Sequence, residues 1–410
     1  MTNVIRTVGA GIVLIVVLFA GSLRECSAST EERAADGGAV SIVFRLRSPS
    51  PARMDAFAAG MAKRTAGMRV EPVVGDVYLA KVRLDEALNN EKAVLNEFMA
   101  SGLVEFARPD GILYPPPDIA ALRAEPAEQE KTWFLTKIQA PVFWEKSKGS
   151  KAIKVLVCDT GVESGHPDLR GNIGPGINLV DGSANTEPTG NGHGTRIAGL
   201  IGARGGHTGT GASGVNWDVT IIPGKISNQA NGGAVHTDTA KCIKWGADQG
   251  IRIVNLSFSG AVDEPVIQEA AKYLRSHNGV LIMSAGNNGV RNDFPDNPDM
   301  IVVGGTNDID WKPPYSNTGP YVDLTAPGSA LYSTDAGGKY SKTSGTSLAT
   351  AVVSGSAALM LSVKPNMTAD QLADLVLKST MDLGTPGRDE AFGAGRLDLK
   401  KALEFLTPWR

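Results

Sequence analysis

The stretch that most constrains the fold is residues 343–361, which reads TSGTSLATAVVSGSAALML. A Gly-Thr-Ser turn leads into residues that are small or apolar on nearly every face of a helix, and such a helix is predicted to be buried. Ser347 then lies at the N-terminus of a central helix, where free backbone N–H groups and the positive end of the helix dipole gather. An isolated serine there is usually only a helix cap, so a chemical role depends on what the rest of the chain brings to it.

The composition is that of a globular chain long enough for one large domain and a small one. It has 410 residues, 42% of them hydrophobic and 20% charged, with a net charge of −3. This balance argues against nucleic acid and against a polybasic membrane surface as partners.

The N-terminus, residues 1–28, is predicted to be a signal peptide. Arg6 supplies positive charge, residues 12–20 form an apolar core, and small residues follow where cleavage could occur. The uncharged run 7–23 is short for a membrane span. We therefore expect a secreted or extracytoplasmic protein, with an uncleaved membrane anchor as the alternative.

Three cysteines occur in the chain, and Cys26 is expected to leave with the signal. Cys158 falls in a predicted core strand and Cys242 in a predicted helix. Because buried cysteines most often behave as small apolar residues, we expect two free thiols, with a disulfide as the alternative.

Residues 39–114 are predicted to form a small α+β domain in the order β-α-β-α-β. The predicted strands are 39–46, 77–82 and 104–109, and the predicted helices are 52–65 and 90–99. Residues 115–132 are polar and Pro-marked without a buried face, which indicates an exposed linker open to proteolysis.

Residues 133–410 alternate between strands and helices. The predicted strands, among them 153–158, 251–256 and 280–283, are almost continuously apolar, which is typical of a parallel sheet covered on both faces by helices. The sequence therefore predicts an α/β domain. In such sheets the functional residues gather at the carboxyl ends of the strands.

Polar residues occur at these ends. Asp159 and Asn287 each follow a predicted strand, and His193 opens a short helix after a Gly-rich turn. Each alone is expected to be a cap or turn residue. Together with Ser347 they supply a carboxylate, an amide donor, a base and a nucleophile.

The order Asp159, His193, Asn287, Ser347 resembles that of the subtilisin-like serine proteases, or subtilases, over residues 133–403. The resemblance implies a parallel-sheet, subtilisin-like catalytic domain at 133–410. Residues 39–114 resemble the family's propeptide more weakly, in size, element order and ending, which implies an intramolecular inhibitor.

The resemblance also implies residue roles. His193 is the general base for Ser347, Asp159 orients the imidazole, and Asn287 with the backbone N–H of Ser347 stabilises the oxyanion. This chemistry requires no cofactor.

Substrate is expected to bind as an added strand. The residues that the resemblance implies for substrate binding are Ser257, Phe258, Ser259, Gly232, Gly233 and Gly286. Asp293 is expected near the segment that shapes the pocket for the residue before the scissile bond, where a carboxylate could favour Lys or Arg; the alternative is an ordinary exposed loop aspartate.

Asp168 matches a position that helps bind calcium in many subtilases, which implies a structural calcium site. The loop 204–214, expected to supply further ligands, is Gly-rich and lacks the usual asparagines. The chain also departs from the family at Arg196, where a second histidine is common, and at Ser259, where glycine is usual.

We therefore expect a secreted, monomeric serine endopeptidase that acts on polypeptides and is made as a self-processed zymogen. The alternative is a catalytically inactive, peptide-binding subtilase homologue. A lipase or esterase is disfavoured by the chain order, and because Ala349 stands where the Gly-x-Ser-x-Gly elbow needs its second glycine.

Overall fold

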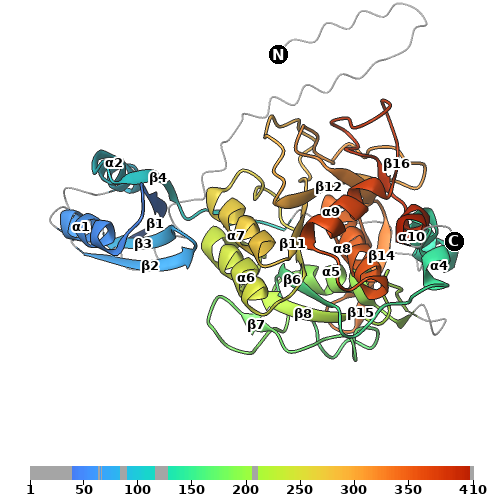
Figure 1. Ribbon diagram of the computed structural model, residues 1–410. Coiled ribbons are helices and arrows are strands. Elements are labelled where there is room, and N and C mark those ends of the chain that lie inside the picture. Colours follow the sequence, from blue (N-terminus) through green and yellow to red (C-terminus); the bar gives the residue numbers. More distant parts are fainter. Residues whose placement is uncertain are drawn as a thin grey trace, which may run out of the picture.

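The computed structural model describes residues 39–115, except 63, 64, 66 and 84–89, and residues 128–406, except 206–210. A small α+β domain lies beside a larger α/β domain (Figure 1). The predicted signal peptide and residues 116–127 of the predicted linker lie outside the described residues.

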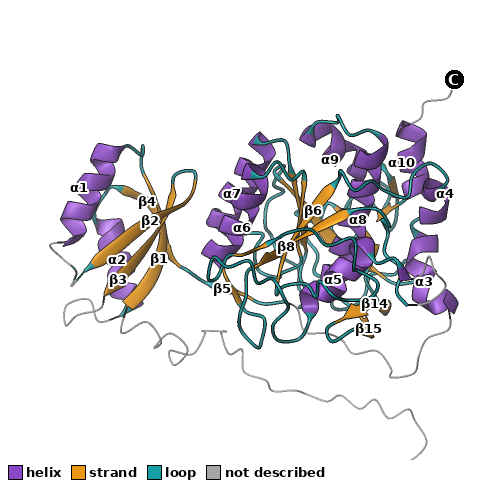
Figure 2. Cartoon of the chain, turned by 90° about the horizontal axis from the view of Figure 1, so that it is seen from below, coloured by secondary structure: helices purple, strands orange, loops and turns teal. Residues whose placement is uncertain are grey.

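The small domain is a sheet with the strand order β2-β3-β1-β4 and two helices packed against it (Figure 2). Phe44 packs against Phe57 and Phe98, with ring centroids 4.9 and 5.3 Å apart. The edge strand β2 was not predicted, because Glu71 and Pro72 interrupt its apolar residues; proline is tolerated on an edge. The elements are β1 (Ala39–Leu46), α1 (Pro51–Ala62), β2 (Met68–Val74), β3 (Val77–Arg83), α2 (Glu91–Ala100) and β4 (Val104–Pro109).

The described part of the large domain is built on a nine-stranded sheet, in which all pairs are parallel except β16–β17. In sheet order the strands are β16 (Thr380–Met381), β17 (Arg396–Leu397), β13 (Leu324–Pro327), β12 (Met300–Thr306), β11 (Val280–Ser284), β10 (Ile253–Leu256), β6 (Lys154–Asp159), β8 (Thr220–Lys225) and β7 (Ile177–Asn178). The α/β prediction is confirmed.

Helices cover both faces of this sheet. The helices are α3 (Glu128–Lys137), α4 (Ala140–Trp144), α5 (His193–Gly202), α6 (His236–Asp248), α7 (Pro265–Ser276), α8 (Thr346–Val363), α9 (Ala369–Lys378) and α10 (Leu399–Leu406). The helix α3 begins within the residues expected to form the linker. Two short pairs complete the fold, β14 (Leu331–Asp335) with β15 (Lys339–Thr343), and β5 (Ile112–Leu113) with β9 (Ala234–Val235).

The alternation of side chains along β6 divides the core in two. Val155 and Val157 point into the apolar cluster that contains α5 and α8, whereas Leu156 and Cys158 point into the cluster that contains α6 and α7. Figure 1 shows α6 and α7 on the side of the small domain. The sheet thus has an α5/α8 face and an α6/α7 face.

Cys158 and Cys242 form a disulfide on the α6/α7 face, so the prediction of free thiols is wrong. The alternation on β6 directs Cys158 toward α6, and Cys242 is fully buried on the face of α6 that meets the sheet. The two Cα atoms are 6.2 Å apart although 84 residues separate them in the chain. Only the tertiary fold reveals this pairing.

The small domain packs on α6 and α7 through one side of its sheet. Val73 and Leu79 belong to the same apolar cluster as these helices. Polar contacts surround it: Arg45 pairs with Glu269, and Lys241 Nζ lies 2.8 Å from Glu71 Oε1. The two domains therefore share a continuous apolar interface.

Among the described residues, one helix, α8, is long and apolar enough to cross a membrane. However, 89% of it is buried inside the protein. It is the core helix that the sequence predicts.

Candidate active site

The carboxyl end of β6 carries Asp159, which bonds to the first residue of α5. Nδ1 of His193 donates to Asp159, at 2.9 Å from Oδ1 and 3.0 Å from Oδ2. The backbone N–H of Thr160 also donates to Oδ1, at 2.7 Å. Both side chains are almost completely buried, with exposed fractions of 0% and 1%. The arrangement fixes the imidazole with Nε2 directed away from the carboxylate.

Ser347 is the second residue of α8, so its backbone N–H has no acceptor within the helix. Its carbonyl oxygen accepts a hydrogen bond from Ser257 Oγ at 3.0 Å. Gly345 leaves open the space in front of the hydroxyl, because a Cβ at that position would lie 2.9 Å from both Ser347 Oγ and Asn287 Nδ2. The hydroxyl and the amide therefore border the same small space.

The Asn287 side chain is held by Thr346. Its Oδ1 accepts from the Thr346 backbone N–H at 2.9 Å and from Thr346 Oγ1 at 2.7 Å. Because Oδ1 is used in this way, the amide orientation is fixed and Nδ2 faces the space beside Ser347. This role of Thr346 was not predicted, although the Gly-Thr-Ser motif was a signal that could have indicated it.

Two buried nitrogens of the predicted site, His193 Nε2 and Asn287 Nδ2, have no hydrogen-bond partner among the described residues, so His193 Nε2 is not hydrogen-bonded to Ser347 Oγ. Buried unpaired groups are rare in folded proteins and call for an explanation. One is a base able to accept a proton, and the other is a donor able to stabilise a negative charge. Both are therefore available to a reacting group bound at Ser347.

The loop before Ser347 is held by a half-buried tyrosine. Tyr315 OH donates to the Gly328 carbonyl at 2.7 Å, and Gly345 N–H donates to the same carbonyl at 2.7 Å. Burial raises the pKa of Tyr315 to about 12, so the phenol stays a neutral donor at all physiological pH values.

A strand of the chain itself lies between the two segments that contain most of the predicted substrate-binding residues, Gly232–Ala234 and Ser257–Ser259, which we call the substrate edges. Ile112 and Leu113 pair antiparallel with Val235 and Ala234, and Tyr114 forms an antiparallel bridge with Ser259. The Ser259 N–H lies 3.4 Å from the Tyr114 carbonyl. The Leu113 side chain is buried.

The remaining predicted substrate-binding residues lie along the same two edges and beside Asn287. A Cβ on Gly233 would lie 3.0 Å from the Tyr114 ring, and one on Gly232 would lie 2.7 Å from Pro115. Ser257 is buried behind Ser347, and the Phe258 ring packs edge-on against His193. Gly286 donates its N–H to Thr346 Oγ1 at 3.2 Å.

Asp168 lies apart from these residues, beside the loop expected to hold calcium. Its Oδ2 accepts from the Ala212 N–H at 2.8 Å, and its carboxylate is packed against Gly205 and Gly211. No group of three His, Cys, Asp or Glu side chains suited to a metal occurs in the described residues. The described donors do not by themselves form a calcium site, so calcium stays a prediction and no step of the chemistry is assigned to it.

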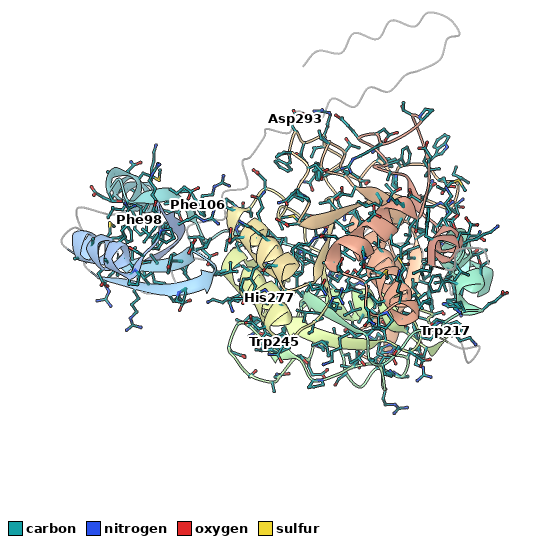
Figure 3. The ribbon with its side chains drawn as sticks, in the orientation of Figure 1. Phe98, Phe106, Trp217, Trp245, His277 and Asp293 are labelled. Atoms are coloured by element: carbon teal, nitrogen blue, oxygen red, sulfur yellow. A yellow bond between two sulfur atoms is a disulfide. The ribbon has the colours of Figure 1, made fainter. Side chains whose placement is uncertain are left out.

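Asp293 lies on an outer loop of the large domain, at the top of Figure 3. Its side chain is 82% exposed and pairs with Arg291, which also pairs with Glu390. A carboxylate held in this way by a neighbouring arginine is poorly suited to receive a substrate Lys or Arg.

The large domain is similar to known proteins. A family model described as "Subtilase family" matches residues 150–395, a range that contains Asp159, His193, Asn287 and Ser347. Thermitase from Thermoactinomyces vulgaris is 36% identical over 273 residues, covering 66% of this chain and 94% of thermitase. The intracellular serine protease of Paenibacillus polymyxa is 33% identical over 271 residues, covering 62% of this chain and 82% of that protein.

Among solved structures, a lanthipeptide protease has a TM-score of 0.61 and 26% identity, covering 72% of this chain and 99% of that one. The family match begins after the small domain, so it concerns the large domain.

Proposed function

Because this chain belongs to the subtilase family and is a serine protease at that level, we propose that it is an endopeptidase with Asp159, His193 and Ser347 as its catalytic residues. The observation that carries the proposal is the pair of buried nitrogens without a hydrogen-bond partner, His193 Nε2 and Asn287 Nδ2, together with the small space beside Gly345 that Asn287 Nδ2 and Ser347 Oγ both border.

In the first step, Ser347 Oγ attacks the carbonyl carbon of a peptide bond while its proton passes to His193 Nε2. Asp159 keeps the proton on Nδ1 and stabilises the imidazolium that forms. The imidazolium then gives its proton to the leaving amine, which produces an acyl-enzyme. Water, deprotonated by the same histidine, releases the acid and restores Ser347.

The negative charge of each tetrahedral intermediate falls on the former carbonyl oxygen. Asn287 Nδ2 and the backbone N–H of Ser347 are the donors to this oxygen. Thr346 fixes the amide in advance, so the donor needs no reorganisation when charge develops.

The chain is made as a precursor inhibited by residues 39–114. Support comes from the strand Ile112–Leu113, which occupies the edge where a substrate strand would add, and from Asp110. The Asp110 carboxylate accepts hydrogen bonds from the Thr237 N–H at 3.1 Å and from Thr237 Oγ1 at 2.6 Å. It therefore caps the N-terminus of α6. Burial raises the pKa of Asp110. Cleavage after this strand, between about Tyr114 and Lys131, would release the domain.

We place the mature enzyme outside the cytoplasm. The apolar segment 12–20 supports export, and the Cys158–Cys242 disulfide is typical of oxidising compartments. One relative is named as an intracellular protease, so the location of this chain needs its own test.

A fluorophosphonate probe tests the proposal, because it reacts with an activated serine. The wild type should be labelled at Ser347, located by mass spectrometry of the labelled peptide, and a folded His193→Ala variant should not be labelled. A folded wild type without any labelling would favour the inactive, peptide-binding homologue instead.

A further inference from the structure

The turn that delivers His193 to the site is held from one side by a buried arginine. Residues 190–192 form this turn, with Gly190 and Gly192 in the left-handed region at φ 68° and 70°. Asn191 Oδ1 accepts the His193 N–H at 3.1 Å. The Asn191 carbonyl in turn accepts from Arg196 Nη1 at 2.6 Å, and the Arg196 side chain is only 3% exposed.

The same nitrogen of Arg196 pairs with a carboxylate from another element. Arg196 Nη1 lies 2.7 Å from Oδ1 of Asp335, the last residue of β14. A Cβ on Gly192 would lie 2.8 Å from the same Oδ1, so the histidine turn and the end of β14 are in direct contact. One nitrogen therefore joins the turn to the strand.

Two hydroxyl groups of β14 strengthen this contact. Ser333 Oγ donates to the Arg196 carbonyl and Thr334 Oγ1 to the Thr195 carbonyl, both at 2.7 Å. The first turn of α5 is thus bonded to β14 through its backbone as well as through Arg196.

The hairpin β14–β15 leads directly to the nucleophile. Its strands pair from Leu331 with Thr343 to Asp335 with Lys339, and β15 ends only four residues before Ser347. Ser344 Oγ accepts the Ala330 N–H at 2.7 Å, which closes the base of the hairpin onto the nucleophile loop. One hairpin therefore contacts the histidine turn near its tip, and its other end leads to the nucleophile.

We propose that Arg196 and Asp335 are positioning residues, which hold His193 Nε2 in line with Ser347 by fixing the histidine turn to the hairpin that carries the nucleophile loop. Neither residue touches substrate, and this role rests on the proposed protease function. Proton transfer between the two side chains depends on their alignment, and a misplacement of about 1 Å can cost about 100-fold in rate.

The test is a comparison of kcat and KM for mature wild type, Arg196→Met and Asp335→Asn on a peptide substrate, below the unfolding temperature of each. Both variants should lose about 10- to 100-fold in kcat. KM should stay within about twofold, because the substrate edges at Gly232–Ala234 and Ser257–Ser259 are untouched. The double variant Arg196→Met/Asp335→Asn should lose no more kcat than the more impaired single variant, since the two residues act through one contact.

Arg196→Lys is the rescue variant. Because a single nitrogen of Arg196 makes both bonds, a lysine ammonium can replace it, and this variant should recover most of the lost kcat. Asp310→Asn is the matched control: its side chain is 23% exposed, as is that of Asp335, and it pairs with Lys137 and Arg396 away from the site. It should lower the unfolding temperature and leave kcat unchanged.

If Arg196→Met fails to fold, Asp335→Asn and Arg196→Lys carry the test. Provided that the wild type is active, two results would overturn this inference and leave the proposed function intact. One is a kcat for Asp335→Asn equal to that of the wild type. The other is a loss of kcat in Asp310→Asn as large as the loss in Asp335→Asn. A folded wild type that does not react with the fluorophosphonate would overturn the proposed function, and this inference with it.

Discussion

The two faces of the large sheet are held together by different interactions. On the α5/α8 face, hydrogen bonds between distant segments hold His193 to Asp159 and Ser347 to Ser257. On the α6/α7 face, an apolar cluster, one disulfide and surface ion pairs receive the small domain. Cys158 and Asp159 are neighbours in β6, yet one belongs to each face. The comparison indicates that chemistry and inhibition can be altered separately, although both depend on the same strand.

The largest expected effect on stability comes from breaking the disulfide. Closing a loop of 84 residues stabilises the fold by about 4–5 kcal/mol in the chain-entropy account. We expect the double variant Cys158→Ala/Cys242→Ala to lose a large part of this, measured by urea unfolding in a Ser347→Ala background that prevents self-digestion.

The same double substitution in the active enzyme tests whether the two faces of the sheet are independent. If the two faces are separable, kcat at a temperature well below unfolding should fall by less than about threefold, because no hydrogen bond of the α5/α8 face is removed. A loss of kcat as large as that of an active-site variant would mean that the disulfide also positions Asp159.

The next largest effect is expected on the α5/α8 face, from Asn287→Ala. Loss of one oxyanion donor in subtilisin costs about 2.7–4 kcal/mol, or about 100- to 1,000-fold in kcat. KM should change little, because the bond strengthens only when charge develops on the oxygen. Steady-state kinetics with a peptide substrate measure both constants, and an unchanged kcat would exclude Asn287 from the site.

The smallest effect concerns the pH dependence of the domain interface. Burial, with Asp110 and Glu71 nearby, raises the pKa of Asp238 from 3.8 to about 6 against the opposing effect of Lys241 and Lys81. Since the folded precursor binds this proton more tightly than the unfolded chain does, the contribution of Asp238 to stability is complete below pH 3.8 and is lost as the pH rises through about 6.

The substitution Asp238→Asn should remove the loss of stability that follows ionisation of Asp238. In the Ser347→Ala precursor, the variant should unfold about 2–4 °C higher than its parent at pH 7 to 8, with the difference shrinking toward pH 4. Differential scanning calorimetry of the two proteins side by side measures this difference at each pH. A difference that does not vary with pH would contradict the raised pKa.

Much of the fold and site follows from local sequence. The apolar strands, the buried helix around Ser347 and the polar residues at strand ends each have a pattern that one segment displays by itself. The edge strand β2 was missed because Pro72 and Glu71 break its pattern, and the hairpin β14–β15 because its strands contain few apolar residues.

The features that were not predicted depend on contacts between distant segments. The Cys158–Cys242 pairing needs the strand and the helix to face each other, and the Arg196–Asp335 pair needs α5 to meet β14. In the sequence, Arg196 is recognisable only as a departure from the family. Its partner could not be identified, because Asp335 lies far along the chain and an aspartate beside Gly337 and Gly338 is typical of a turn.

The central claim is that Ser347 performs the chemistry and that the chain's own N-terminal domain is its first substrate. The most direct test is mass spectrometry of purified wild type and Ser347→Ala, produced side by side in a protease-free host. Wild type should lose residues 39–114 by a cut between about Tyr114 and Lys131, and Ser347→Ala should remain a folded precursor that keeps residues 39–131. If Ser347→Ala matures as fast as wild type, self-processing by Ser347 is contradicted.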